Sequence, residues 1–255
     1  MNVPAAEQPL LSILRCARPI LLYNDCYEYP YSISGTAFIV RFSERLFVVT
    51  AKHALRLRDF NPNQFRVQYH PERAEMLPTR ALYLFRDTQL DDSDQNDVAA
   101  WDLDAAQTAE QLFGEYTPYE LNRAQNLEEL NPASDYLYRG YPIQTRNIDF
   151  QERQYDQDSV SGAADYIGRS RTIARVHELR FRNLGELTEL DGLSGSPVFQ
   201  TRRLEGRYST ESLAGMLIRG TVESGTGYFL EYSRIVELLT DIVAGLVDDR
   251  YDRPR

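Results

Sequence analysis

Three short segments of the chain carry side chains that could act together in nucleophilic catalysis. Ser194 lies in the glycine-rich segment Asp191–Val198, His53 follows an apolar run, and Asp97 directly precedes another. A neutral hydroxyl is a poor nucleophile, so a catalytic serine needs a general base, such as an imidazole oriented by a carboxylate. The order His, Asp, Ser is one of three in which this triad occurs. The segments therefore predict acyl transfer, with Ser194 as nucleophile, His53 as general base and Asp97 orienting the imidazole.

The glycines around Ser194 indicate a second catalytic feature. Gly192 and Gly195 permit a tight turn in which the N–H groups of Gly192 and Ser194 can point at one spot. Such a pair of donors forms an oxyanion hole, in which each donor lowers the barrier by about 2.7–4 kcal/mol. Glycine- and serine-rich turns are also common without catalysis, and Ser196 is a second candidate nucleophile in the same segment.

His53 and Asp97 each have alternatives. At the end of the apolar run Leu46–Val49, His53 is also consistent with a structural histidine at the rim of a sheet. Asp97 is preferred over its neighbours because it alone is followed at once by an apolar strand, Val98–Leu103. The competing aspartates are Asp91, Asp92, Asp94, Asp102 and Asp104.

Four blocks of the sequence resemble the trypsin-like (chymotrypsin-fold) serine proteases, and the bacterial stand-alone members more than the secreted digestive ones. The blocks are Gly35–Val40, Val48–His53, Asp97–Leu103 and Gly192–Pro197, within a similarity that extends from about Gly35 to about Leu239. The resemblance implies an all-β fold of two six-stranded antiparallel β-barrels, with the active site between them and an acyl-enzyme mechanism. It also implies that Ser194, rather than Ser196, is the nucleophile.

The same resemblance assigns residues to substrate binding. The strand around Ile218, Arg219 and Gly220 would pair with the backbone of an extended substrate, and Gly227 would form a second wall of the primary specificity pocket.

At the base of that pocket the register places Thr188, with Glu189 beside it. A carboxylate there favours cleavage after Arg or Lys. Leu217 stands near the position where glutamate-specific relatives have a histidine, so an acidic side chain would lack a partner. The alternative for Glu189 is a solvent-facing loop carboxylate.

Two departures from the family concern activation and redox state. In zymogen-type members an aspartate precedes the nucleophile and pairs with a new N-terminal amine, but here Leu193 takes that place. A leucine cannot form that ion pair, so we expect direct folding into a competent state or ordering by a partner. The second departure is the lack of cysteines near the active site: the two present are Cys16 and Cys26, whose pairing stays open.

The composition of the 255 residues narrows the partners and cofactors. A formal net charge of −10 argues against a nucleic-acid backbone or an anionic membrane surface as the main partner, so we expect no nucleic acid and no membrane among the partners. The N-terminus lacks the features of a secretory signal, which together with the few cysteines predicts a cytoplasmic protein with reduced thiols. His70 and His177 fit no motif, and no Cys/His cluster or phosphate loop is present, so we expect no cofactor and no metal.

Turn-forming residues divide the chain into segments. We expect a helical segment over residues 1–18 and a first barrel, carrying His53 and Asp97, over residues 19–115. Residues 116–133 are expected to form a linker. Residues 134–247 predict a second barrel carrying Ser194 and a C-terminal helix, and 248–255 a tail. The C-terminal helix is expected over Ser233–Val247 with Ser233 as its N-cap, and Gln151–Ser170 is expected to be a surface loop.

Apolar, β-branched and aromatic runs mark the expected strands. Those of the first barrel are Ile20–Tyr23, Gly35–Phe42, Leu46–Val49, Phe65–Tyr69, Ala81–Phe85 and Val98–Leu103. Those of the second are Tyr136–Tyr141, Ile143–Phe150, Ile173–Phe181, Ser196–Thr201, Ser212–Arg219 and Gly227–Glu231. Ser43–Arg45 predicts a tight hairpin connection.

The sequence therefore predicts a serine endopeptidase that cleaves polypeptide substrates. Bacterial proteins of this kind often belong to signalling or antiviral defence modules, and by that analogy we expect a regulatory protein partner. Two alternatives stay open. One is an effector subunit that is silent until a partner engages it, and the other is a pseudoprotease that binds an extended peptide without cutting it.

Overall fold

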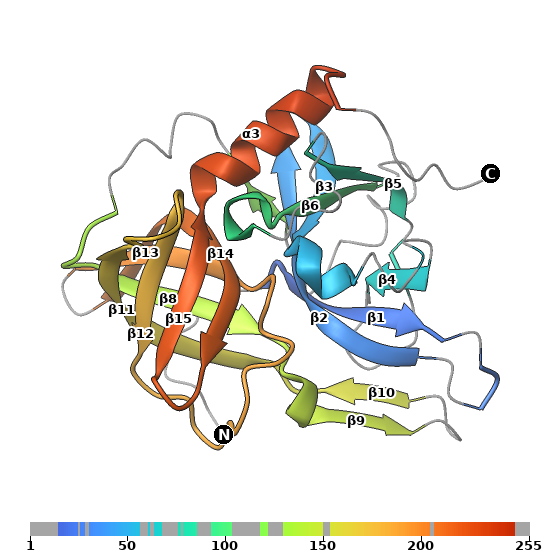
Figure 1. The fold of residues 1–255 in the computed structure, drawn as a ribbon, viewed down its shortest axis with the longest axis horizontal. Helices are drawn as coiled ribbons and strands as arrows, with labels where there is room; N and C mark the ends of the chain where they lie inside the picture. Colours follow the sequence, from blue (N-terminus) through green and yellow to red (C-terminus); the bar gives the residue numbers. More distant parts are fainter. Residues whose placement is uncertain are drawn as a thin grey trace.

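The computed structural model describes residues 15–24, 26–28, 31–56, 61, 64–67, 76–77, 79–85, 93–103, 118–121, 130–149, 154–204 and 207–247. Most of these residues lie in β-strands, which confirms the all-β prediction. The strands form an N-terminal sheet and a C-terminal barrel, with helix α3 (Tyr232–Val243) following the last barrel strand (Figure 1).

The N-terminal sheet has the strand order β4-β1-β2-β3-β6-β5, with β7 paired parallel to β2. Its strands are β1 (Ala17–Tyr23), β2 (Tyr31–Phe42), β3 (Arg45–Thr50), β4 (Phe65–Val67), β5 (Thr79–Leu84), β6 (Ala99–Leu103) and β7 (Tyr119–Glu120). β2 and β3 form the predicted hairpin, and its turn residues Ser43 and Glu44 have φ angles of 49° and 64°, as a type I′ hairpin turn requires.

Closure of this sheet into a barrel is not confirmed. Among the described residues no ladder joins the outer strands β4 and β5, and one backbone hydrogen bond from Leu77 N–H to the Val67 carbonyl (2.8 Å) links the segment before β5 to β4. The helix predicted within residues 1–18 lies mostly outside the described residues, and β1 already begins at Ala17.

The C-terminal unit is a closed barrel in the order β11-β12-β15-β14-β13-β8. Its strands are β8 (Asp135–Gly140), β11 (Val160–Arg169), β12 (Val176–Phe181), β13 (Pro197–Leu204), β14 (Arg207–Thr221) and β15 (Thr226–Glu231). All the pairings within it are antiparallel.

Two predictions in this unit are wrong. Gln151–Ser170 is not a loop, because it contains barrel strand β11, in which Ser161, Asp165 and Arg169 are exposed and the residues between them are mostly partly buried. Ile143–Phe150 is not a barrel strand, because β9 (Arg146–Asp149) within it pairs with β10 (Gln154–Gln157) as a separate two-stranded sheet.

Helix α3 joins the two units. It begins at Tyr232, so Glu231 rather than Ser233 is the N-cap, and it ends at Val243, before the predicted Val247. Its buried Ile235 packs in an apolar cluster that includes side chains from both units, among them Phe38, Phe47, Phe199 and Leu213. This shared core fixes the units against each other and so positions residues at their boundary. No helix of the described residues is long and apolar enough to cross a membrane.

Candidate active site

His53 lies three residues after the end of β3, in the 3₁₀ turn η1 (Lys52–Leu55). Burial anchors this turn, because Ala51 and Leu55 are fully buried. Arg56 ends it in a left-handed conformation (φ 42°), with its N–H donating to the His53 carbonyl (3.0 Å). The ring of His53 stays half-exposed. The local sequence thus presents the imidazole at the end of a buried strand.

Asp97 ends the 3₁₀ turn η3 (Asp94–Asn96), just before β6, and is buried. Its Oδ1 accepts a hydrogen bond from the backbone N–H of His53 (2.8 Å), and its Oδ2 lies 2.5 Å from His53 Nδ1. Because an ionised carboxylate can only accept, Nδ1 carries the proton, and Nε2 is the acceptor in the neutral ring. The two contacts therefore fix both the orientation and the tautomer of the imidazole.

Ser194 is the third member of this group. Its Oγ lies 2.9 Å from His53 Nε2 and 3.1 Å from the Ile218 carbonyl oxygen. A hydroxyl has one hydrogen, so the two acceptors compete for it. When the imidazole of His53 is neutral, the Ser194 hydroxyl donates to Nε2. When the imidazole is protonated, Nε2 donates to Oγ and the hydroxyl donates to the Ile218 carbonyl instead. Ser196, the other candidate nucleophile, is fully buried.

Two glycines shape the turn that carries Ser194. Gly192 and Gly195 have φ angles of 93° and 92°. A Cβ at Gly195 would lie 1.8 Å from the Thr36 carbonyl oxygen, so a larger residue does not fit. Across the described residues, the N–H groups of Gly192 and Ser194 donate to no protein acceptor, whereas that of Gly195 donates to the Leu217 carbonyl (2.7 Å). Two free donors thus lie beside the serine, as an oxyanion hole requires.

Thr36 holds this turn from the N-terminal sheet, a role that was not predicted from the sequence. It is fully buried in β2, and its Oγ1 donates to the Gly192 carbonyl (2.7 Å) and accepts from the Tyr141 N–H (2.9 Å). Its own N–H donates to the Ser194 carbonyl (2.9 Å). The signal in the sequence is a single hydroxyl residue in the apolar run Gly35–Val40.

Leu193 holds the turn from the barrel side. Its side chain is 3% exposed and belongs to the barrel core, together with Tyr138, Phe181 and Leu217. The turn therefore depends on apolar packing at Leu193, the position to which the sequence resemblance would assign the aspartate of zymogen-type proteases.

A cavity of about 180 Å³ lies beside His53 and Ser194. It is lined by His53, Phe181, Leu190, Asp191, Leu193, Ser194, Leu217, Ile218, Arg219 and Gly220. Phe181, Leu193 and Leu217 are buried, whereas its charged lining residues are exposed. Three of the predicted wall residues thus line the cavity. Gly227 does not, because a Cβ there would lie 2.5 Å from the Phe181 ring, so this glycine makes room for the phenylalanine.

The structure does not bring Thr188 and Glu189 to this cavity. Both are exposed, and their backbone N–H groups donate to Gln144 Oε1 at 2.9 and 3.2 Å. The preceding Leu187 takes the buried position instead. The carboxylate on which cleavage after Arg or Lys would depend is therefore not among the described residues that line the cavity.

The charges around His53 favour its protonated form. Burial lowers the pKa of His53, but the hydrogen bond and charge of Asp97, helped by Asp94, outweigh burial and Lys52 and raise the pKa above the ordinary 6.5. The pKa of Asp94 is itself raised, because its burial outweighs the nearby Arg219 cation. The raised pKa strengthens His53 as a general base for proton transfer.

None of the remaining candidate groups that the structure describes lines this cavity. Within the described part of the chain, no three His, Cys, Asp or Glu side chains are arranged to hold a metal ion. His177 is buried beside Glu231, and His70 lies outside the described residues. Cys16 is buried, Cys26 is exposed, and both thiols are free. The chain matches no protein-family model and no curated protein.

Proposed function

We propose that the chain is a trypsin-like serine endopeptidase. The observation that carries the proposal is the pair of contacts made by one imidazole, with Nδ1 on Asp97 (2.5 Å) and Nε2 on Ser194 (2.9 Å). The three residues come from distant parts of the chain and meet beside a cavity and two free N–H donors. Nucleophile, base, orienting group and oxyanion donors are the parts that acyl transfer needs.

In the proposed reaction Ser194 Oγ attacks the carbonyl carbon of a peptide bond while His53 Nε2 takes the hydroxyl proton. Asp97 stays ionised and stabilises the imidazolium, and the N–H groups of Gly192 and Ser194 stabilise the tetrahedral oxyanion. The C–N bond then breaks, the leaving amine takes the proton from Nε2, and an acyl-enzyme remains. Water, deprotonated by His53, hydrolyses this ester and restores the hydroxyl.

The lining of the cavity favours a substrate with an apolar residue immediately before the scissile bond. Phe181, Leu190 and Leu217 would surround its side chain, and burial of apolar surface stabilises by roughly 25 cal/mol per Å². A Lys or Arg would lose its hydration there without a buried carboxylate in return. We therefore propose apolar specificity in place of the Arg or Lys expected from Glu189.

Three finer points belong to the same proposal. The N-terminal sheet would close through β4 and β5 into a second six-stranded barrel. The two free thiols favour a cytoplasmic location. The buried Leu193 favours a turn that is competent without a partner, over the partner-gated alternative.

Hydrolysis of a peptide library that varies the residue before the scissile bond tests the proposal. We expect cleavage after large apolar residues, no cleavage by Ser194→Ala, and retained activity in the matched control Ser196→Ala. A Ser194→Ala variant as active as wild type would refute the peptidase assignment. Cleavage after Arg or Lys would leave that assignment intact and refute the apolar specificity.

A further inference from the structure

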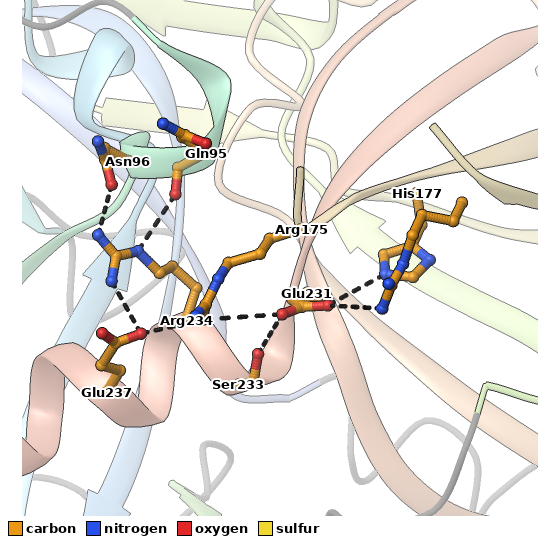
Figure 2. Close-up of polar contacts among 9 residues, drawn as sticks. Gln95, Asn96, Arg175, His177, Glu231, Ser233, Arg234 and Glu237 are labelled. Atoms are coloured by element: carbon orange, nitrogen blue, oxygen red, sulfur yellow. Dashed lines mark hydrogen bonds and ion pairs between the residues drawn. The ribbon is translucent and has the colours of Figure 1, made fainter. Parts of the chain in front are cut away.

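The turn that carries Asp97 is held by an arginine from the C-terminal helix. Arg234, in the first turn of α3, donates from Nε to the Gln95 carbonyl (3.2 Å) and from Nη2 to Asn96 Oδ1 (Figure 2). Gln95 and Asn96 are residues of η3, and Asp97 directly follows them. Arg234 therefore contacts the residue next to the carboxylate that orients His53.

The guanidinium of Arg234 makes polar contacts along its edges and packs on an aromatic ring with one face. Its Nη1 pairs with Glu237 (2.8 Å), which also accepts from Arg175 (3.0 Å), and its centre lies 3.4 Å from the centroid of the Phe85 ring. Figure 2 shows the arginine between Glu237 on one side and η3 on the other. A planar guanidinium can make these contacts together, whereas the single ammonium of a lysine cannot.

These contacts cross the boundary between the two units. Asp97 and His53 adjoin strands of the N-terminal sheet, whereas Ser194 adjoins the barrel, and α3 directly follows barrel strand β15. Arg219 of β14 adds an ion pair with Asp94 of η3 (2.8 Å), although the two groups are not aligned as a hydrogen bond. The turn η3 is thus fixed to the half of the molecule that carries the serine.

We propose that Arg234 is a positioning residue, which holds η3 so that both carboxylate oxygens of Asp97 reach His53. This inference rests on the proposed function. A displacement of η3 would lengthen the contacts of 2.8 and 2.5 Å between Asp97 and His53, and a misplacement of about 1 Å costs on the order of 100-fold in rate. Arg234 does not line the substrate cavity, so the loss should fall on kcat rather than KM.

Steady-state kinetics of Arg234→Ala and Arg234→Lys test the proposal against Arg41→Ala, a matched control that breaks an ion pair with Glu120 elsewhere on the sheet. We expect kcat to fall about 10- to 100-fold in Arg234→Ala, with KM changed by less than about twofold. Arg234→Lys should recover little of the loss, and Arg41→Ala should match wild type. If Arg234→Ala does not fold, Asn96→Ala removes one of the contacts and should show the same changes at smaller amplitude.

A proton NMR titration of His53 in the free protein gives a second readout that needs no turnover. Asp97 and Asp94 raise the pKa of His53 against burial and Lys52, so we expect the pKa of His53 to fall in Arg234→Ala. A merely structural role would lower the Tm and leave this pKa unchanged. Unchanged kcat, or an unchanged pKa of His53, would overturn the inference. If wild type hydrolyses no peptide, the proposed function fails, and the titration still decides the role of Arg234.

Discussion

Replacement of Thr36 by valine tests how the nucleophile turn is held. Valine keeps the β-branched shape in β2 but lacks Oγ1, which donates to the Gly192 carbonyl (2.7 Å) and accepts from the Tyr141 N–H (2.9 Å). Both contacts are buried, and each buried group left without a partner costs about 1–3 kcal/mol. We expect the free energy of unfolding to fall by about 2–6 kcal/mol, and the Tm by at least about 4 °C for a chain of this length.

The same substitution should reduce turnover. Oγ1 of Thr36 fixes the Gly192 carbonyl in the same turn as the N–H groups of Gly192 and Ser194, which we propose as the oxyanion donors. Loss of one such donor costs about 100- to 1,000-fold in kcat. The assay is kcat together with thermal unfolding for Thr36→Val and for Thr36→Ser, which retains the hydroxyl and should recover most of both. Wild-type kcat in Thr36→Val, or equal damage in Thr36→Ser, would refute the reasoning.

Three further predictions concern charge and packing. Because the pKa of His53 is raised, the acid limb of the pH profile of kcat/KM should lie above pH 6.5 in wild type and at lower pH in Asp97→Asn. The kcat of Asp97→Asn should also be about 10,000-fold lower than that of wild type. The His53–Asp97 contact should stabilise the fold fully below pH 6.5, and this stabilisation should be lost as pH rises through the folded pKa of His53. Urea unfolding of wild type and of Asp97→Asn at a series of pH values would show the loss. The hydrogen bond from His177 lowers the pKa of Glu231 to about 2, against its burial, so Glu231→Gln should be less stable than wild type above pH 4.5, with the difference vanishing as pH falls towards 2. Leu193→Asp puts a carboxylate without an ammonium partner into the barrel core, and calorimetry should show a lower Tm at pH 7 than at pH 4.

The group around His53 was predictable because each member adjoins a strand with a readable pattern. Asp97 lies two residues before the apolar β6, His53 follows the buried β3, and Gly192 and Gly195 mark a turn that other residues cannot adopt. Such local signals need no knowledge of which strands pair.

The specificity cavity and the supports of the group were not predictable in the same way. Phe181 reaches the cavity because barrel closure packs it against Gly227, and Gln144 draws the backbone of Glu189 to the surface. Both contacts join segments that are far apart in the sequence, so no local pattern encodes them. Arg234 contacts η3 across more than a hundred residues of chain, which no local pattern encodes.

Reaction with a fluorophosphonate, followed by mass spectrometry of proteolytic fragments, tests the central claim most directly. If His53, oriented by Asp97, activates the nucleophile, one adduct should form, at Ser194, in wild type and in Ser196→Ala. The adduct should be absent from Ser194→Ala and should form far more slowly in His53→Ala. No adduct in wild type, an adduct on another residue, or an equal rate in His53→Ala would contradict the proposed triad.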